Sequence, residues 1–247
     1  MAMLNKLFRV ELLKIRRSLA LLMMLVCPLM VVVLVFGVGL KQTSSADFHE
    51  KTWFALWQTC TALWCYFMLP LYIALITGLL NGNEHKNQTW RLMLALPISL
   101  RQLYIVKALM AWAFVIAANL LLAIYIFLVA SVLAVLGYPM QGAFEYPIWH
   151  AVLAISLGCF PILVIQHAIS WRFSNIVFPL ATGVIATMGI VQLGSSKYWV
   201  YYPWSYTLMA VNGSAPEMQQ KALMLATVLG AVLFALTCYW LGKREVS

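Results

Sequence analysis

Residues 19–40 read LALLMMLVCPLMVVVLVFGVGL, a run of 22 residues without one charged side chain. A helix of this length is about 33 Å long, which is enough to cross the ~30 Å hydrocarbon core of a bilayer. The apolar core of a secretory signal is only about 7–15 residues long. We therefore expect a retained membrane span here, in preference to a signal peptide cleaved after Ala46.

Five more apolar runs follow, near residues 53–80, 108–136, 148–170, 173–193 and 222–241, and none contains Asp, Glu, Lys or Arg. They lack the two-residue alternation of barrel strands, so they are predicted to be helices. The whole chain is 64% hydrophobic and 9% charged, against about 25% charged residues in soluble domains. The sequence predicts an all-α polytopic membrane protein, with residues 1–247 forming a single domain of six transmembrane helices.

Lys and Arg are distributed unequally between the connections. Six spans place 12 of the 16 basic residues on the side of the two termini and four on the other side. Cytoplasmic loops of membrane proteins carry the excess of Lys and Arg. Both termini are therefore predicted to be cytoplasmic.

Motifs for catalysis or cofactor binding are missing. The sequence has no GxxxxGK[ST] phosphate loop, no HExxH, no GxSxG and no CxxC, and its connections are all shorter than 30 residues. We expect no catalytic, cofactor-binding or metal-binding residues in this chain. The one ionisable side chain well inside a predicted span is His167, beside Gln166. It is read as a hydrogen-bonded packing residue, with a proton relay as the alternative.

The N-terminal arm, residues 1–18, has the pattern of an amphipathic helix lying on the inner membrane surface. One face is apolar: Leu4, Leu7, Phe8, Leu12 and Ile15. The other face is basic: Lys6, Arg9, Lys14, Arg16 and Arg17. The plainer alternative is that these charges only set the topology. Glu11 falls within the apolar arc, so it is expected to pair with Lys14 or to meet another cytoplasmic segment.

The cytoplasmic connection, residues 81–107, is patterned as two helices separated by a bend. The first covers 84–91 and has three apolar residues at its end and just beyond, on one side: Trp90, Met93 and Leu94. Pro97 ends it, and Ser99 with Gln102 forms a capping box for the next helix, which leads into the third span. The segment is either a stable turn or a rigid element against which a cytoplasmic partner pushes.

Residues 198–206 read YWVYYPWSY, with six aromatic residues among nine, inside the extracytoplasmic connection 194–221. One interpretation is a belt of aromatic side chains at the membrane interface. The other is an outer lid of short helices over a translocation path.

At this point the chain resembles the membrane subunits of bacterial ABC exporters, the superfamily of O-antigen, drug and lantibiotic-immunity permeases. Three segments carry the resemblance, together with the size and the six spans: ELLKIRRS at 11–18, the stretch 84–107 with LPIS at 96–99, and PWSY at 203–206. They are similar to a connecting helix, a coupling segment after the second span and a segment before the last span. The run 85–89 lacks the glycine often found after the glutamate of the coupling region.

The resemblance implies roles for three groups of residues. The ATPase-coupling group is Glu84, Trp90, Arg91, Leu94, Pro97, Ser99 and Arg101. The connecting-helix group is Glu11, Lys14, Arg16 and Arg17. The outer-gate group is Tyr198, Trp199, Tyr201, Tyr202, Pro203, Trp204 and Tyr206.

The resemblance also implies the partners. Two permease chains, as a homodimer or a heterodimer, would join two ATP-binding subunits in the bacterial inner membrane, with ATP and Mg on those partners and no cofactor on this chain. The expected cargo is amphipathic or lipid-like, with a peptide antibiotic favoured. The alternatives are another drug, lipid or glycan as cargo, or a non-transporting membrane anchor that recruits a cytoplasmic partner.

Overall fold

The structure is a computed structural model that describes residues 2–15, 18–42, 50–86, 99–194, 196–213 and 215–244. Every regular element in these ranges is helical, as the sequence predicts. In chain order they are α1 (Ala2–Ile15), α2 (Leu19–Gln42), α3 (Glu50–Leu63), the π-helix η2 (Trp64–Met68), α4 (Leu69–Lys86), α6 (Leu100–Val135), α7 (Ile148–Gly158), α8 (Phe160–Arg172), α9 (Val177–Leu193), the 3₁₀ turns η3 (Lys197–Tyr201) and η4 (Pro203–Ser205), α10 (Tyr206–Asn212) and α11 (Pro216–Arg244).

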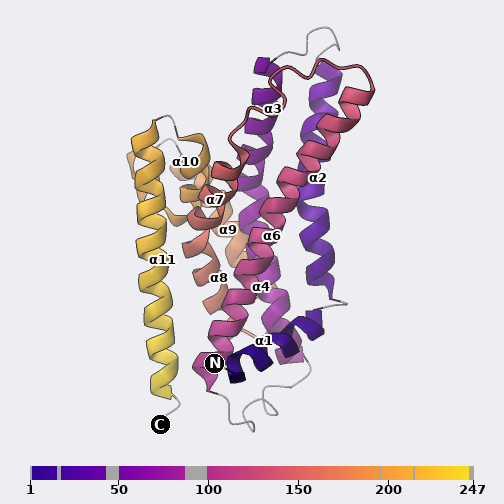
Figure 1. Cartoon of the computed structure of the whole chain (residues 1–247). Coiled ribbons are helices and arrows are strands. Elements are labelled where there is room, and N and C mark those ends of the chain that lie inside the picture. Colours follow the sequence, from indigo (N-terminus) through magenta and orange to yellow (C-terminus); the bar gives the residue numbers. More distant parts are fainter. Residues whose placement is uncertain are drawn as a thin grey trace.

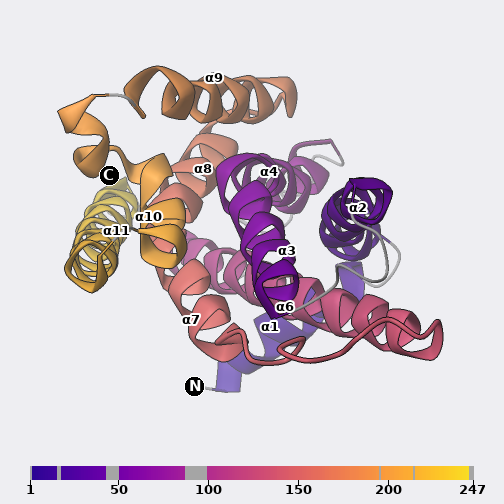
Figure 2. The same ribbon diagram turned by 90° about the horizontal axis from the view of Figure 1, so that it is seen from above.

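Among the described residues, four continuous helices are long and apolar enough to cross a membrane: Leu19–Lys41, Lys51–Gly82, Leu100–Val135 and Pro216–Lys243. The pair α7 and α8 makes a fifth when it is counted as one bent span. Helix α9, at the position of the predicted fifth span, has 17 residues, or about 25 Å. Figure 2 shows α9 from its side while α2 and α11 are viewed nearly end-on. The count of six spans therefore stays a prediction.

The two ends of the bundle differ in what they carry. Helix α1, the first turns of α6 and the last turns of α11 lie together at one end, here called the basal end (Figure 1). Helix α10 lies toward the opposite end, here called the outer end, beside the first turns of α11 (Figure 1). The two ends of the chain thus approach the same end of the bundle. That this end faces the cytoplasm stays a prediction from the charge distribution.

The predicted span 148–170 is interrupted. Helix α7 ends at Gly158, α8 begins at Phe160, and the two meet at an angle of 41°. Pro161 lies in the first turn of α8. A proline has no N–H to donate, and its ring clashes with the carbonyl four residues earlier, so an unbroken helix through this point is unfavourable. The proline favours a break of the apolar run at this point.

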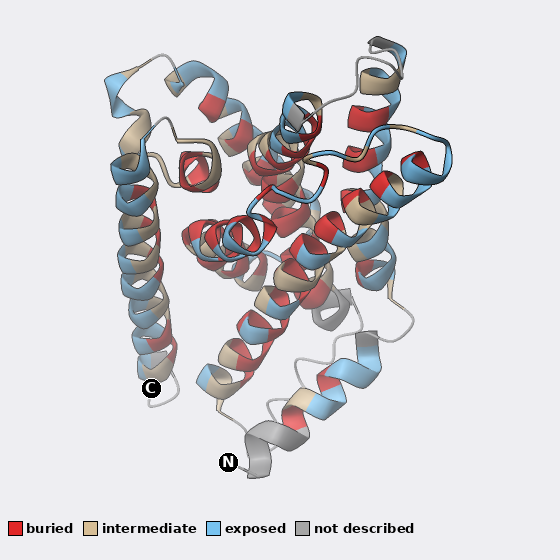
Figure 3. Cartoon of the chain, turned by 45° about the horizontal axis from the view of Figure 1, so that its top comes forward, coloured by how far each residue is buried: buried red, intermediate tan, exposed pale blue. Residues whose placement is uncertain are grey.

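The core is built around one face of the helix that runs from α3 into η2. Trp53, Trp57 and Trp64 are fully buried there, and Figure 3 shows buried residues concentrated on the inward faces of the helices. The indole N–H of Trp53 donates to the Pro139 carbonyl and that of Trp57 to the Ala143 carbonyl, both at 2.8 Å. Buried indoles need such partners. These bonds fasten the connection after α6 onto α3.

Candidate functional site

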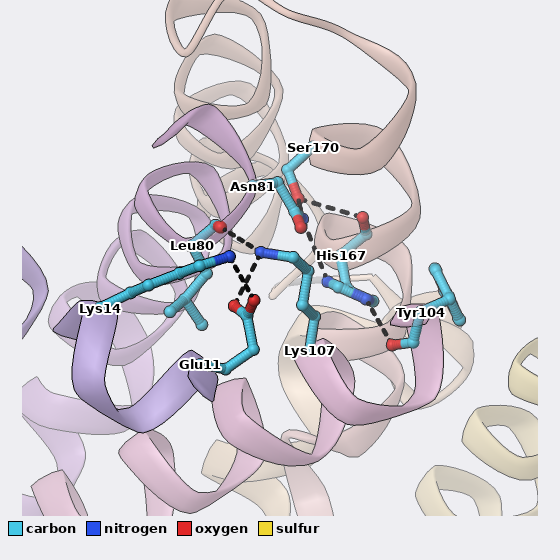
Figure 4. Close-up of polar contacts among 8 residues, drawn as sticks. All are labelled: Glu11, Lys14, Leu80, Asn81, Tyr104, Lys107, His167 and Ser170. Atoms are coloured by element: carbon cyan, nitrogen blue, oxygen red, sulfur yellow. Dashed lines mark hydrogen bonds and ion pairs between the residues drawn. The ribbon is translucent and has the colours of Figure 1, made fainter. Parts of the chain in front are cut away.

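A buried polar cluster at the basal end joins four helices that are far apart in the sequence. We call it the basal network, and Figure 4 shows its eight members: Glu11, Lys14, Leu80, Asn81, Tyr104, Lys107, His167 and Ser170. They come from α1, α4, α6 and α8. Buried polar groups cost free energy unless they are paired, so a cluster of this kind has to be well satisfied to persist.

Helix α1 is attached through one narrow face. Leu7 is buried, Phe8 is half-buried and Glu11 is 2% exposed, whereas Leu12 is 48% exposed. Among the side chains of α1 that the structure describes, the face that packs on the protein is therefore Leu7–Phe8–Glu11; the side chains of Leu4 and Ile15, also predicted for the apolar face, fall outside that description. The predicted apolar face divides in two, because Leu12 points away from the bundle. Its outward position suits a helix lying against lipid.

The Glu11 carboxylate accepts two charged hydrogen bonds. Lys14 Nζ lies 2.7 Å from Oε1, and Lys107 Nζ lies 3.1 Å from Oε2. The side chain of Lys14 is 37% exposed and that of Lys107 is 1% exposed. Both alternatives predicted for Glu11 thus occur together: it pairs within α1 and it meets α6, the helix that begins inside the predicted 81–107 connection. Because Lys107 is buried, breaking its pair with Glu11 should cost more free energy than breaking the exposed pair of Glu11 with Lys14.

Lys107 connects this ion pair to α4. Its ammonium donates to the Leu80 carbonyl at 2.8 Å as well as to Glu11. One side chain of α6 therefore holds both α1 and the last part of α4. These contacts sit where α4 leaves the bundle and α6 re-enters it.

Asn81, the next residue of α4, connects the network to α8. Its Nδ2 donates to Ser170 Oγ at 2.7 Å and lies 3.2 Å from His167 Nδ1. His167 Nε2 lies 3.2 Å from the Tyr104 carbonyl. A carbonyl only accepts, so Nε2 carries the proton and Nδ1 accepts from Asn81. Each ring nitrogen of His167 thus has a hydrogen-bond partner, as the packing interpretation predicts, and the role of His167 stays a prediction.

The predicted coupling residues lie at the edge of the described structure. Trp90, Arg91, Leu94 and Pro97 fall outside the described residues, as does the side chain of Glu84. Arg16 and Arg17 of the predicted connecting helix also fall outside them. Ser99 and Arg101 are described, at the start of α6. The basal network brings together the two helices, α4 and α6, that flank this segment.

The capping box predicted at Ser99 is confirmed. Ser99 Oγ accepts from the Gln102 N–H at 3.1 Å, and the Ser99 N–H donates to Gln102 Oε1 at 3.4 Å. The cap fixes where α6 begins after the connection. It also places Lys107 about two turns into α6, inside the protein.

The predicted outer-gate residues occupy η3, η4, Tyr202 between them and the first turn of α10. Tyr198 and Tyr201 are exposed, Trp204 and Tyr206 are buried, and the others are half-buried. The Tyr202 hydroxyl donates to the Ala186 carbonyl of α9 at 2.6 Å. The segment is a set of short helices that packs into the outer end of the bundle. Its role as a gate stays a prediction.

Helix α10 contacts the π-helical turn η2, which interrupts the helix of the second predicted span. In η2 the Leu69 N–H bonds to the Trp64 carbonyl, five residues back. Continuing this pattern, residue 70 would donate to the Cys65 carbonyl, but residue 70 is proline and has no N–H. Thr207 of α10 supplies the missing donor, with its hydroxyl 3.3 Å from the Cys65 carbonyl. Such π-helical turns are frequent at functional sites.

A glycine allows this close approach. A Cβ at Gly158, the last residue of α7, would lie 3.1 Å from Thr207 Cα and 3.4 Å from the Thr207 nitrogen. Backbone atoms cannot move aside as a flexible side chain does. Gly158 therefore lets α10 sit directly against the break between α7 and α8.

Sequence reasoning missed several members of these sites. Lys107 entered the sequence analysis only as one of the basic residues that predict membrane orientation. Five other members were not singled out: Leu80, Asn81, Tyr104, Ser170 and Thr207. Two signals were present: the Ser99 cap places Lys107 inside a helix, and Pro70 lies within an apolar span. The partners of these residues come from distant segments, which no local pattern identifies.

These features define a multi-pass helical membrane protein whose distinctive polar site lies at one end of the bundle. A family model described as ABC-2 family transporter protein matches residues 7–190, from α1 into α9. The chain belongs to the ABC-2 transporter family. Comparisons with curated proteins and with solved structures found no match.

Family membership has two direct consequences. The chain is a transmembrane component of an ABC transporter and not its ATPase. Membership of the family also implies that the chain pairs with an ATP-binding subunit. The matched range contains the whole basal network and both helices that flank the predicted coupling segment.

Proposed function

We propose that this permease exports an amphipathic or lipid-like molecule, driven by ATP hydrolysis on a separate subunit. A peptide antibiotic is the favoured cargo, with export serving immunity. The predicted spans carry no charged side chain, which suits a cargo that is taken up from the membrane and moved outward. Another drug, lipid or glycan would suit the same architecture.

The observation that supports coupling is the basal network. A cytoplasmic ATPase acts on a permease through the segments that face it, which here are α1 and the connection between α4 and α6. Lys107 holds α1 through Glu11 and α4 through the Leu80 carbonyl, and Asn81 extends the contact to α8. A push on residues 87–98 would thus move four helices together.

The assembly that we propose contains two permease chains and two ATP-binding subunits in the bacterial inner membrane. The second permease chain completes the translocation path, with the outer aromatic segment near the dimer axis. ATP and Mg are bound by the partner subunits. The alternative class, a membrane anchor without transport, is disfavoured by membership of a transporter family.

The test is reconstitution of the permease with its ATP-binding subunit in vesicles. ATP should drive movement of a labelled lantibiotic peptide or a labelled phospholipid, and changing the phosphate-loop lysine of the ATP-binding subunit should abolish it. The permease alone should not hydrolyse ATP. Hydrolysis by a verified single-chain sample, or ATP turnover by the complex without movement of any amphiphile, would contradict the proposal.

A further inference from the structure

A cleft at the basal end separates α11 from α6 and α8. Its volume is about 670 Å³, within the range of roughly 300–1,000 Å³ of small-ligand sites. Its walls combine aromatic and aliphatic side chains with one cation: Tyr104, Trp171, Arg172, Leu236 and Trp240. Tyr104 belongs both to this wall and to the basal network, so the cleft adjoins the network and differs from it in its other residues.

Two side chains that line the cleft lie on the exposed face of α11, which is predicted to face lipid. Leu236 is 58% exposed and Trp240 is 45% exposed, both on α11, and the outer face of this helix is exposed along its length in Figure 3. Tryptophans commonly mark the level of the lipid headgroups. An occupant could therefore enter sideways from the bilayer, with its apolar part against α11.

Arg172 supplies the charge. It is the last residue of α8 and it is exposed. Within the described part of the chain, no carboxylate forms a salt bridge with it. A second guanidinium, that of Arg101 in the first turn of α6, lies beside the Cys238 thiol of α11. Guanidinium groups bind phosphate oxygens with two parallel hydrogen bonds.

We propose that this cleft binds an anionic phospholipid of the inner leaflet. The phosphate would pair with Arg172, and the first part of an acyl chain would lie between Trp240 and Leu236, with the remainder in the bilayer. Charge complementarity and the lateral opening favour a lipid over a water-soluble anion. The proposal does not depend on the cargo or on the direction of transport.

Native mass spectrometry of the purified permease, titrated with phosphatidylglycerol or phosphatidylcholine, tests the proposal. Arg172→Gln should weaken phosphatidylglycerol binding about fivefold, the effect of about 1 kcal/mol for one basic residue at a membrane surface. Phosphatidylcholine binding should change little. Ala168→Leu, which fills the cleft and keeps every charge, should also reduce phosphatidylglycerol occupancy.

The matched control is Lys51→Gln, which removes one exposed positive charge at the start of α3. It should leave phosphatidylglycerol binding within a factor of two. Equal effects of Arg172→Gln and Lys51→Gln would overturn the proposal, because they would indicate attraction to net charge alone. Retention of lipid by Ala168→Leu at the parent level would also overturn it. So would cross-linking of Trp240→Cys between two permease chains, because the cleft would then hold a second copy.

Discussion

Replacing Glu11 by alanine should release α1 from the basal end of the bundle. The Lys107 side chain is 1% exposed, and the change removes the Glu11 carboxylate that lies 3.1 Å from its ammonium. The Leu80 carbonyl stays as a partner of that ammonium. Breaking a buried ion pair by removing one partner costs about 3–5 kcal/mol. Lys14→Ala removes the exposed half of the same cluster and should cost at most about 1 kcal/mol.

Cysteine labelling measures this release directly. Leu7 is buried against the bundle in the parent, so a Leu7→Cys variant should react slowly with a water-soluble maleimide. A loss of about 3 kcal/mol raises the undocked fraction of α1 by roughly a hundredfold, and Glu11→Ala should speed labelling accordingly. The same Glu11→Ala change without the added cysteine gives the background from the native thiols.

A paired substitution distinguishes a missing contact from an unpaired charge. Glu11→Leu with Lys107→Met removes both charges, and replacing a buried ion pair by apolar residues is often neutral or stabilising. The double variant should therefore label more slowly than Glu11→Ala. Equal labelling of Glu11→Ala and Lys14→Ala would refute the view that the buried pair with Lys107 holds α1.

Two further substitutions and one cross-linking experiment test other features of the molecule. Ser99→Ala removes the cap of α6 and should cost about 1 kcal/mol in thermal unfolding while the chain still inserts; an unchanged melting temperature would contradict the importance of the cap. Thr207→Val keeps the size of the side chain but removes the donor to the Cys65 carbonyl, at a cost of about 1–3 kcal/mol. Proteolysis of the outer segment should therefore accelerate. A rate of proteolysis equal to that of the parent would show that this bond does not hold α10. Cross-linking within the membrane should give a permease dimer, most directly between α2 or α9 of two chains, because the resemblance to ABC exporter permeases implies that the first and fifth spans face each other. A complex with one permease and one ATP-binding subunit would contradict the proposed assembly.

Local signals in the sequence predicted the local features of the fold. The capping box at Ser99 and Gln102 was readable because a helix start is determined by residues three apart. The Glu11–Lys14 pair was readable for the same reason, since both lie on one turn of helix. The helical class followed from six long apolar runs, because unpaired backbone is not tolerated in lipid.

Features that depend on tertiary contacts could not be predicted from the sequence. Lys107 meets Glu11 only after α1 docks beneath α6, and Thr207 meets Cys65 across 142 positions of sequence. The break at Cys159 was signalled by Pro161, but a proline also occurs inside the continuous helix α2, at Pro28. Proline alone therefore does not decide whether an apolar run bends into two helices.

The most direct test of the account is retention of the ATP-binding subunit by the permease. If residues 81–107 form the coupling segment, Trp90→Ala with Arg91→Ala removes an aromatic anchor, which commonly costs 2 kcal/mol or more at an interface, or about thirtyfold in affinity. This variant should insert and dimerise normally but lose the ATP-binding subunit during purification or no longer link its hydrolysis to cargo. Lys51→Ala, in α3, should behave like the parent. Full retention of the subunit and a normal cargo response in the Trp90→Ala, Arg91→Ala variant would contradict the assignment of this segment to coupling.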